Sequence, residues 1–194
     1  MREALIQYIK SRTTTPLSEN DMETLNTIFV PKRLRKRQFL LQAGEVCKYT
    51  GFLVKGAMRQ YSVDEKGIEH VVELSIEEWW VGDRESFVNL TPSLFYIDAW
   101  ENSDLLLLSR DDYFNKLKPI PAVVELSGKL DERHAFAMQR KVNAFISMSA
   151  EERYNELLHT YPEFLQRFPQ HIVASYLGIT KETLSRIRHH AVNR

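Results

Sequence analysis

The stretch 170-QHIVASYLGITKETLSRIRHH-190 contains two short helical patterns separated by a glycine. Ala174 is small where two crossing helices must approach closely, and Gly178 stands where a tight turn needs a positive φ that disfavours side chains. Thr180 is placed to cap the second helix. The pattern predicts a helix-turn-helix, against the alternative of an ordinary helical hairpin with a polar outer face. The inward-facing set is Val173, Ala174, Leu177, Ile179, Leu184 and Ile187.

The outward face of the second helix is polar and basic. Arg186 has the geometry for a bidentate contact to guanine O6 and N7, and Glu182 can accept a hydrogen bond from cytosine N4. Lys181 and Arg188 suit phosphates, which position a protein on DNA without specifying sequence. A solvated helix offers another reading, in which Glu182 pairs with Arg186 four residues on, a pairing that would also orient Arg186. The candidate DNA-binding residues are Thr180, Lys181, Glu182, Ser185, Arg186, Arg188 and His189.

Charge is concentrated at this end of a neutral chain. The 194 residues carry 26 basic and 26 acidic side chains, yet residues 167–194 hold five basic residues (the last is Arg194) against Glu182 alone, a local charge of +4. A basic end on a neutral chain indicates local attraction to phosphates. With 43% hydrophobic and 27% charged residues, the chain is long enough for one sizeable core or two small domains.

Cys47 is the only cysteine, which excludes an intrachain disulfide and a thiolate metal cluster. Its neighbour Lys48 could lower the thiol pKa, although a buried, unreactive cysteine is the commoner case. The N-terminal residues lack a signal-peptide core, and the longest apolar run, residues 105–108, is too short to span a bilayer. We therefore expect a cytoplasmic protein with no membrane partner.

The middle third of the chain reads as short antiparallel strands after helical residues 3–30. Runs 51–63 and 67–80 are joined by the turn tetrad "DEKG", and runs 94–100 and 104–110 add two strands. The second run alternates, which predicts one buried face and one wet face. The two faces are Ile68, His70, Val72, Leu74 and Ile76, and opposite them Glu69, Val71, Glu73, Ser75 and Glu77.

A long helix is predicted from Pro121 to Ser147, followed by another that starts at Ser149, with Pro162 and Pro169 bracketing a short connector. The long helix carries an apolar stripe at three- and four-residue steps. The stripe could lie on the strands of the same chain, but sustained spacing of this kind favours a seam that pairs two chains. The candidate dimer interface is Val123, Leu126, Leu130, His134, Met138, Val142 and Phe145.

The segment 179-ITKETLSRIR-188 resembles the recognition helix of the Crp/Fnr superfamily of bacterial transcription regulators, with Lys181 in place of the usual arginine. Residues 39–61 resemble the start of that family's cyclic-nucleotide-binding β-roll, with glycines at its turns, and 121–147 its dimerisation helix. The resemblance implies an α+β chain with three parts: a sensor roll at 1–118, the dimerisation helix at 119–147 and a helix-turn-helix domain at 148–194. It implies a homodimeric, DNA-binding transcription regulator.

Two departures from the family pattern affect function. Cyclic-nucleotide binders use a glutamate and, about ten residues on, an arginine that takes the cyclic phosphate; here Asp83 replaces the glutamate and "PSLFY" (92–96) supplies no cation. We therefore expect no cyclic AMP binding, and a pocket near Trp79 and Tyr96 that suits a less charged effector or none. The chain also ends at Arg194 without room for the usual wing, so we expect other backbone contacts, for example from the end of the 149–160 helix. The candidate ligand residues are Gly82, Asp83, Arg84 and Tyr96.

Three functions compete on this sequence. A transcription regulator is favoured, with double-stranded DNA and a second copy of the chain as partners and RNA polymerase as a further candidate. The second is a cyclic-nucleotide or small-ligand sensor whose C-terminal helices contact a protein. The third, an enzyme, lacks support, because no nucleophile elbow, phosphate loop, metal-spaced histidine cluster or haem ligand set is visible. We expect no enzyme activity and no resident cofactor or metal.

Overall fold

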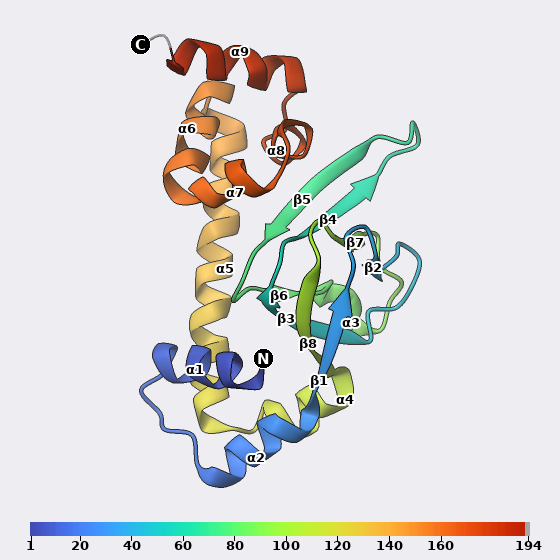
Figure 1. Cartoon of the computed structure of the whole chain (residues 1–194), viewed down its shortest axis with the longest axis vertical. Helices are drawn as coiled ribbons and strands as arrows, with labels where there is room; N and C mark the ends of the chain where they lie inside the picture. Colours follow the sequence, from blue (N-terminus) through green and yellow to red (C-terminus); the bar gives the residue numbers. More distant parts are fainter. Residues whose placement is uncertain (193–194) are drawn as a thin grey trace. The chain divides into compact units, whose positions relative to one another are not determined.

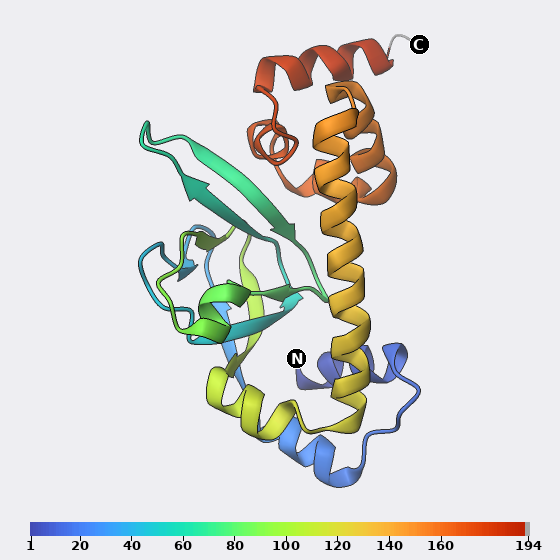
Figure 2. The ribbon, with the colours of Figure 1, turned by 180° about the vertical axis from the view of Figure 1, so that it is seen from behind.

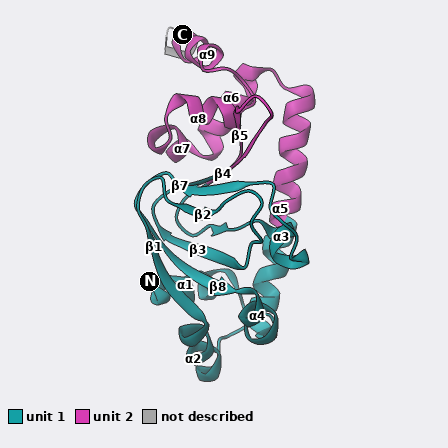
Figure 3. Cartoon of the chain, turned by 90° about the vertical axis from the view of Figure 1, so that its right-hand side faces the viewer, with its two compact units in different colours: residues 1–60, 75–132 teal, residues 61–74, 133–194 magenta. Residues whose placement is uncertain are grey.

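The computed structural model describes the backbone of residues 1–192 and the side chains of residues 1–190. The chain forms two compact units, residues 1–60 with 75–132, and residues 61–74 with 133–194 (Figure 3). No helix within the described residues is long and apolar enough to cross a membrane.

Helices stand at both ends of the described chain, with the short strands and the short helix α3 between them, as the sequence predicts for an α+β protein (Figure 1). The N-terminal elements are α1 (Arg2–Arg12), α2 (Glu19–Ile28), β1 (Phe29–Leu34), β2 (Phe39–Leu41), β3 (Tyr49–Lys55), β4 (Met58–Val63), β5 (Glu69–Ser75), β6 (Trp80–Val81) and α3 (Arg84–Asn89). The C-terminal elements are β7 (Tyr96–Ala99), β8 (Ser103–Ser109), α4 (Arg110–Asp112), a π-helical turn η1 (Tyr113–Leu117), α5 (Pro121–Ser147), α6 (Ala150–Thr160), α7 (Pro162–Arg167), α8 (Gln170–Tyr176) and α9 (Lys181–Val192).

The strands form two four-stranded sheets, with orders β1-β8-β3-β6 and β2-β7-β4-β5. Strand β8 is central in the first sheet, between β1 and β3, with Phe29 opposite Leu108 and Phe52 opposite Leu106. A central strand can be buried on both faces, which explains why residues 105–108 read as a continuous apolar run. Leu105 enters one hydrophobic cluster, and Leu106 and Leu108 enter another.

Two N-terminal helices help to build the second of these clusters. Helix α1 contributes Leu5, Tyr8 and Ile9, and the Tyr8 ring lies 4.9 Å from that of Phe52. Helix α2 starts at a capping box, in which the Ser18 hydroxyl accepts from the Asp21 amide and the Asp21 carboxylate accepts from the Ser18 amide. The predicted N-terminal helical region is confirmed, with its end at Ile28, where β1 begins.

The predicted facing of the second strand run is wrong in its outer half. Ile68 is 53% exposed and His70 is exposed, while Val71, assigned to the wet face, is buried together with Leu74. Residues 63–70 are exposed throughout, so alternation buries neither face at this end of the β4–β5 hairpin. The turn itself is as predicted, with Gly67 at φ +79° and the Asp64 carboxylate accepting from the Lys66 and Ile68 amides.

In the second unit, the C-terminal helices pack around Phe164, Phe168 and Leu184. Helix α6 starts where predicted, at Ser149, which forms a capping box with Glu152. The connector predicted between the two prolines is instead largely helix α7, because proline at the first helical position has a suitable φ and needs no amide partner. The predicted domain boundaries at residues 118 and 147 stay a prediction. The two compact units divide α5 between them, and residues 61–74 belong to the same unit as residues 133–194.

Candidate nucleic-acid interface

Helices α8 and α9 and the turn between them form the predicted helix-turn-helix. The turn reverses at Gly178, whose φ is +67°, and the Ile179 amide returns to the Ala174 carbonyl at 3.0 Å. Ile179 is partly buried at the corner. The other inward-facing residues are confirmed as buried, namely Val173, Ala174, Leu177, Leu184 and Ile187. Burial on one side of both helices leaves the other side of α9 to solvent.

The start of α9 is capped by a threonine pair. The Thr180 hydroxyl accepts from the Thr183 amide at 3.2 Å and lies 3.1 Å from the Thr183 hydroxyl. Thr183 also accepts a hydrogen bond from Arg186 Nη2 at 3.3 Å. Within residues 1–192 Arg186 and Glu182 form no ion pair, so Thr183, and not the acidic side chain, orients the arginine. The guanidinium remains exposed for another contact.

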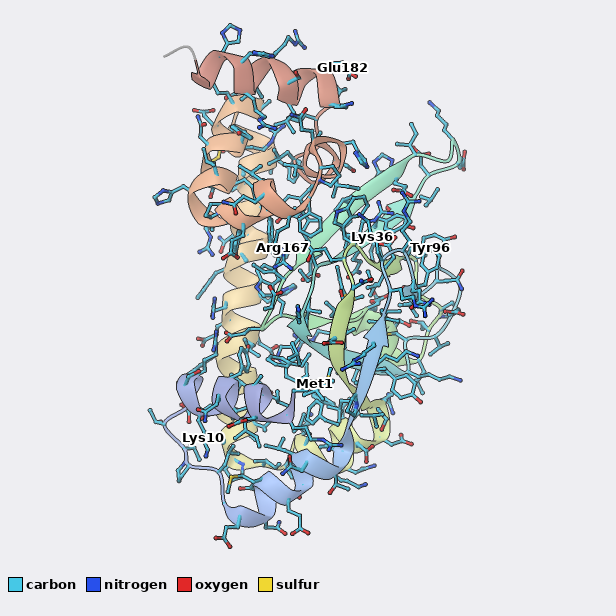
Figure 4. All side chains as sticks on the ribbon, in the orientation of Figure 1. Met1, Lys10, Lys36, Tyr96, Arg167 and Glu182 are labelled. Atoms are coloured by element: carbon cyan, nitrogen blue, oxygen red, sulfur yellow. The ribbon has the colours of Figure 1, made fainter. Side chains whose placement is uncertain are left out.

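The predicted DNA-binding residues share one exposed surface. Six of them are exposed and Ser185 is partly exposed. Glu182 lies in the first turn of α9, where Figure 4 labels it. The exposed members are Thr180, Lys181, Glu182, Arg186, Arg188 and His189. Arg194, counted in the basic end, lies outside the described residues.

A groove of about 310 Å³ on this surface adds a residue that sequence reasoning missed. Gln170, the first residue of α8, lines it together with Lys181, Glu182 and Ser185 of α9. The start of α8 and the first turns of α9 therefore border the same hollow. The side-chain amide of Gln170 can contact either a phosphate or a base edge. The sequence signal was its place directly after Pro169, at a helix start.

The predicted dimer stripe lies on the long helix α5 (Figure 2) and has a buried part and an exposed part. Val123 and Leu126 are buried in the core that α1 and α2 share, and Leu130 packs against it, so these three act within their own chain. From His134 onward the stripe is exposed. Met138 is 48% and Val142 56% exposed, and Phe145, Phe136 and Ile146 are exposed as well.

The roll uses its candidate ligand residues for its own structure. Asp83 is the N-cap of α3 and accepts from the Glu85 and Ser86 amides, and its other carboxylate oxygen accepts from the Ser93 hydroxyl at 2.7 Å. Ser93 belongs to the segment where the family arginine is expected. Arg84 points to α5, where its Nη1 lies 2.5 Å from an oxygen of Asp131. The Asp83 carboxylate therefore finds its hydrogen-bond partners within the roll, and Arg84 forms its ion pair outside the roll.

A buried cation that sequence reasoning missed lies on β4. Arg59 is 7% exposed and forms a two-pronged ion pair with Asp98 of β7, at 2.8 and 3.1 Å. Its guanidinium also lies 5.5 Å from the centre of the Trp100 ring. The carboxylate neutralises this charge, so Arg59 is not free to bind a phosphate. An arginine on one strand and an aspartate on another gave no sequence signal of their pairing.

The pocket is predicted near Trp79 and Tyr96, and neither residue lines the cavity that the roll contains. The Tyr96 ring of β7 lies against Phe39. The roll does contain a cavity of about 340 Å³ whose lining is part apolar and part polar: Leu40, Leu41, Glu45, Val46, Cys47, Lys48, Tyr49, Gly82 and Ile97.

Cys47 in this lining is a buried thiol rather than a reactive one. Its side chain is 3% exposed and donates to the Tyr49 carbonyl at 3.2 Å, and burial raises the pKa of the Cys47 thiol. A thiol with a raised pKa holds little thiolate near neutral pH. The described residues contain no cluster of histidine, cysteine or acidic side chains that could hold a metal ion.

Known proteins resemble this chain along most of its length. Residues 31–118 match the family model of the cyclic nucleotide-binding domain. Regulatory protein HlyX of Actinobacillus pleuropneumoniae is 23% identical over 183 residues, which cover 88% of this chain and 75% of that protein. The anaerobic regulatory protein of Haemophilus influenzae is 23% identical over 187 residues, which cover 88% and 70%. FixK2 of Bradyrhizobium japonicum shares the fold, with a TM-score of 0.74, 16% identity, and coverage of 86% of this chain and 85% of that one.

Proposed function

We propose that the chain is a homodimeric transcription regulator of the Crp/Fnr type that reads double-stranded DNA with α9, in line with its similarity to the regulators named above. The observation that carries this proposal is the exposed face of α9 behind a buried helix-turn-helix core. A helix presented in this way fits the major groove, with the residues of its N-terminal part near the base edges.

The polar residues of this face divide into two roles. Arg186 is exposed, oriented by Thr183, and placed to contact a guanine, while Glu182 is placed to contact a cytosine. Lys181, Arg188 and the hydroxyls of Thr180 and Ser185 serve phosphates, as does Gln170 at the edge of the groove. His189 lies on the same exposed face.

The exposed part of the α5 stripe supports a dimer. Met138, Val142 and Phe145 are large apolar side chains left in contact with solvent on successive turns of one helix. Covering them with the same helix of a second chain would bury both sets. A dimer would present two α9 helices to half-sites about 34 Å apart. RNA polymerase is a further partner of such a regulator.

The roll is proposed to sense something other than cyclic AMP, or nothing. A cyclic phosphate entering the roll would need a cation, because an unpaired buried charge costs several kcal/mol. Arg84 is paired with Asp131 and Arg59 with Asp98, while Asp83 would repel the phosphate. The cavity combines apolar side chains with the oppositely charged Glu45 and Lys48, so a small effector with little net charge suits it better than an anionic nucleotide.

Selection of bound duplexes from a random library, followed by fluorescence anisotropy at 50–300 mM salt, tests the proposal. We expect an enriched sequence with two related half-sites and an affinity that falls steeply with salt, since each displaced phosphate counterion adds to the slope. If no sequence is enriched and the double variant Lys181→Ala, Arg186→Ala leaves binding unchanged, α9 contacts something other than DNA, such as a protein.

A further inference from the structure

Strand β5 is joined to the helix-turn-helix by side chains instead of a neighbouring strand. It lies at the edge of the order β2-β7-β4-β5, where backbone groups face outward without a strand partner. Ser175 of α8 fills part of that edge. Its hydroxyl accepts from the Val71 amide at 2.9 Å and donates to the Glu69 carbonyl at 3.0 Å. One hydroxyl group therefore makes both hydrogen bonds that an adjacent strand would otherwise make.

A second side chain holds the same strand from α5. Lys141 Nζ donates to the Val72 carbonyl at 2.6 Å and lies 4.1 Å from the centre of the Tyr176 ring, where its charge is attracted to the ring face. Tyr176 follows Ser175 on α8 and packs edge-on against Phe164 of α7 at 6.1 Å. Strand β5, helix α5 and helix α8 therefore meet within the second unit (Figure 3).

Glu73 brings a carboxyl group into this junction without a partner for it. Glu73 is itself only partly buried, and within the described residues no hydrogen bond or ion pair reaches its carboxylate. Burial raises the pKa of Glu73 to about 7, and the positive charge of Lys141 opposes this only in part. Burial also lowers the pKa of Lys141. An ionised carboxylate is costly in such a place.

We propose that β5 is a latch on the DNA-reading module, held closed by Ser175 and Lys141 and opened when Glu73 becomes charged. This inference rests on the proposed function and concerns its regulation. In the closed latch α8 is fixed to β5 and α5, and α9 follows it across the turn at Gly178. A recognition helix that is already fixed in place loses less conformational entropy when it binds DNA, so it binds more tightly.

The carboxyl group sets the direction of the pH effect. The pKa of Glu73 is about 7 in the closed latch, against an ordinary 4.5 in water, so closing takes up a proton between these values. The closed state therefore loses stability as pH rises from about 4.5 to about 7, by at most ~10-fold per pH unit in the closed-to-open ratio, and then levels off.

The other ionisable groups near Glu73 come from the elements packed around it. Lys141 faces it from α5 and Tyr176 from α8, with Tyr161 beyond Tyr176. Burial raises the pKa of Tyr176 to about 12, so this phenol stays neutral across the window. His70 of β5 pairs instead with Asp64 at the exposed turn. The effect to measure is the difference between wild type and Glu73→Gln, since that difference isolates the contribution of Glu73.

The test follows the full chain from pH 5.5 to 8 by two readouts. One is affinity for the selected duplex; the other is hydrogen exchange of residues 69–74, corrected for the intrinsic pH dependence of exchange. In the wild type we expect protection and specific affinity to fall together with rising pH, the affinity by ~10-fold as the closed fraction shrinks. Glu73→Gln should remove this loss. The matched control Glu65→Gln, an exposed carboxylate in the turn of the same hairpin, should keep it.

A second pair of variants tests the hydrogen bonds. Ser175→Ala should expose the 69–74 segment to exchange at pH 6 and weaken specific binding by ~10-fold, and Ser175→Thr, which keeps the hydroxyl, should restore both. Identical pH profiles for wild type and Glu73→Gln, or unchanged protection in Ser175→Ala, would overturn the latch. A chain that binds no selected duplex at any pH contradicts the proposed function instead, and the exchange readout still tests the latch.

Discussion

Gly178 is the residue on which the geometry of the DNA-reading module most depends. Its φ is +67°, and a Cβ placed there would lie 2.6 Å from Phe145 Cε1. We predict that Gly178→Ala destabilises the chain by about 1–3 kcal/mol, since a left-handed backbone is strained for alanine. Thermal unfolding followed by circular dichroism should show a melting temperature several degrees lower.

Gly128 provides the control for that substitution. It lies inside α5, and a Cβ added there meets no atom within 4 Å. Gly128→Ala should therefore stabilise the helix by about 0.5–1 kcal/mol, because alanine loses less backbone freedom on folding. Equal changes of melting temperature in Gly178→Ala and Gly128→Ala would show that a side chain does not strain the turn at Gly178.

Arg186 and Arg188 should separate base reading from phosphate contact. Arg186→Ala should cost about 1–3 kcal/mol on the selected site and relax the preference at one base pair. Arg188→Ala should weaken all duplexes alike and reduce the slope of log affinity against log salt by about one. Anisotropy titrations against the selected duplex and its single-base variants measure both. A uniform loss in both variants would make Arg186 a phosphate contact.

At the scale of elements, α5 offers a test of dimerisation that leaves the chain's own core intact. Leu130 is a poor choice, because it packs against the buried cluster of its own chain. Val142 is 56% exposed, and Val142→Glu should yield monomers and abolish binding to the two-half-site duplex, since two carboxylates would meet in the seam. Sedimentation equilibrium at micromolar concentration measures the change.

The matched control places the same carboxylate on the opposite face of α5. Arg140 is exposed and two residues from Val142, about 200° around the helix. Arg140→Glu should leave the oligomeric state unchanged. A wild-type chain that sediments as a monomer would contradict the proposed dimer. A Val142→Glu variant that still sediments as a dimer would show that the dimer interface lies elsewhere.

At the scale of the whole molecule, we predict that cyclic nucleotides neither bind the roll nor change DNA affinity. Each candidate arginine already has a carboxylate partner, and Asp83 caps α3. Calorimetry with cyclic AMP and cyclic GMP should detect no binding at micromolar concentrations, and anisotropy should give the same DNA affinity with and without them. A micromolar dissociation constant that Arg84→Ala removes would show that Arg84 leaves Asp131 to take the phosphate.

The sequence determined the features that depend on neighbouring residues. The helix-turn-helix follows from apolar spacing on each side of one glycine, and the capping boxes at Ser18 and Ser149 from residues three positions apart. The strands beside the "DEKG" turn follow from local turn chemistry. These interactions close within a few residues, so the order of residues is sufficient to predict them.

Tertiary structure decided what depends on residues far apart in the chain. Which end of the α5 stripe is buried depends on α1 and α2, and the pairing of Arg59 with Asp98 depends on strand order. Glu73 likewise reads as one polar position in an alternating strand until Lys141 and Tyr176 are brought beside it. Burial and charge environment are properties of the packed neighbours, and periodicity along one segment carries no information about them.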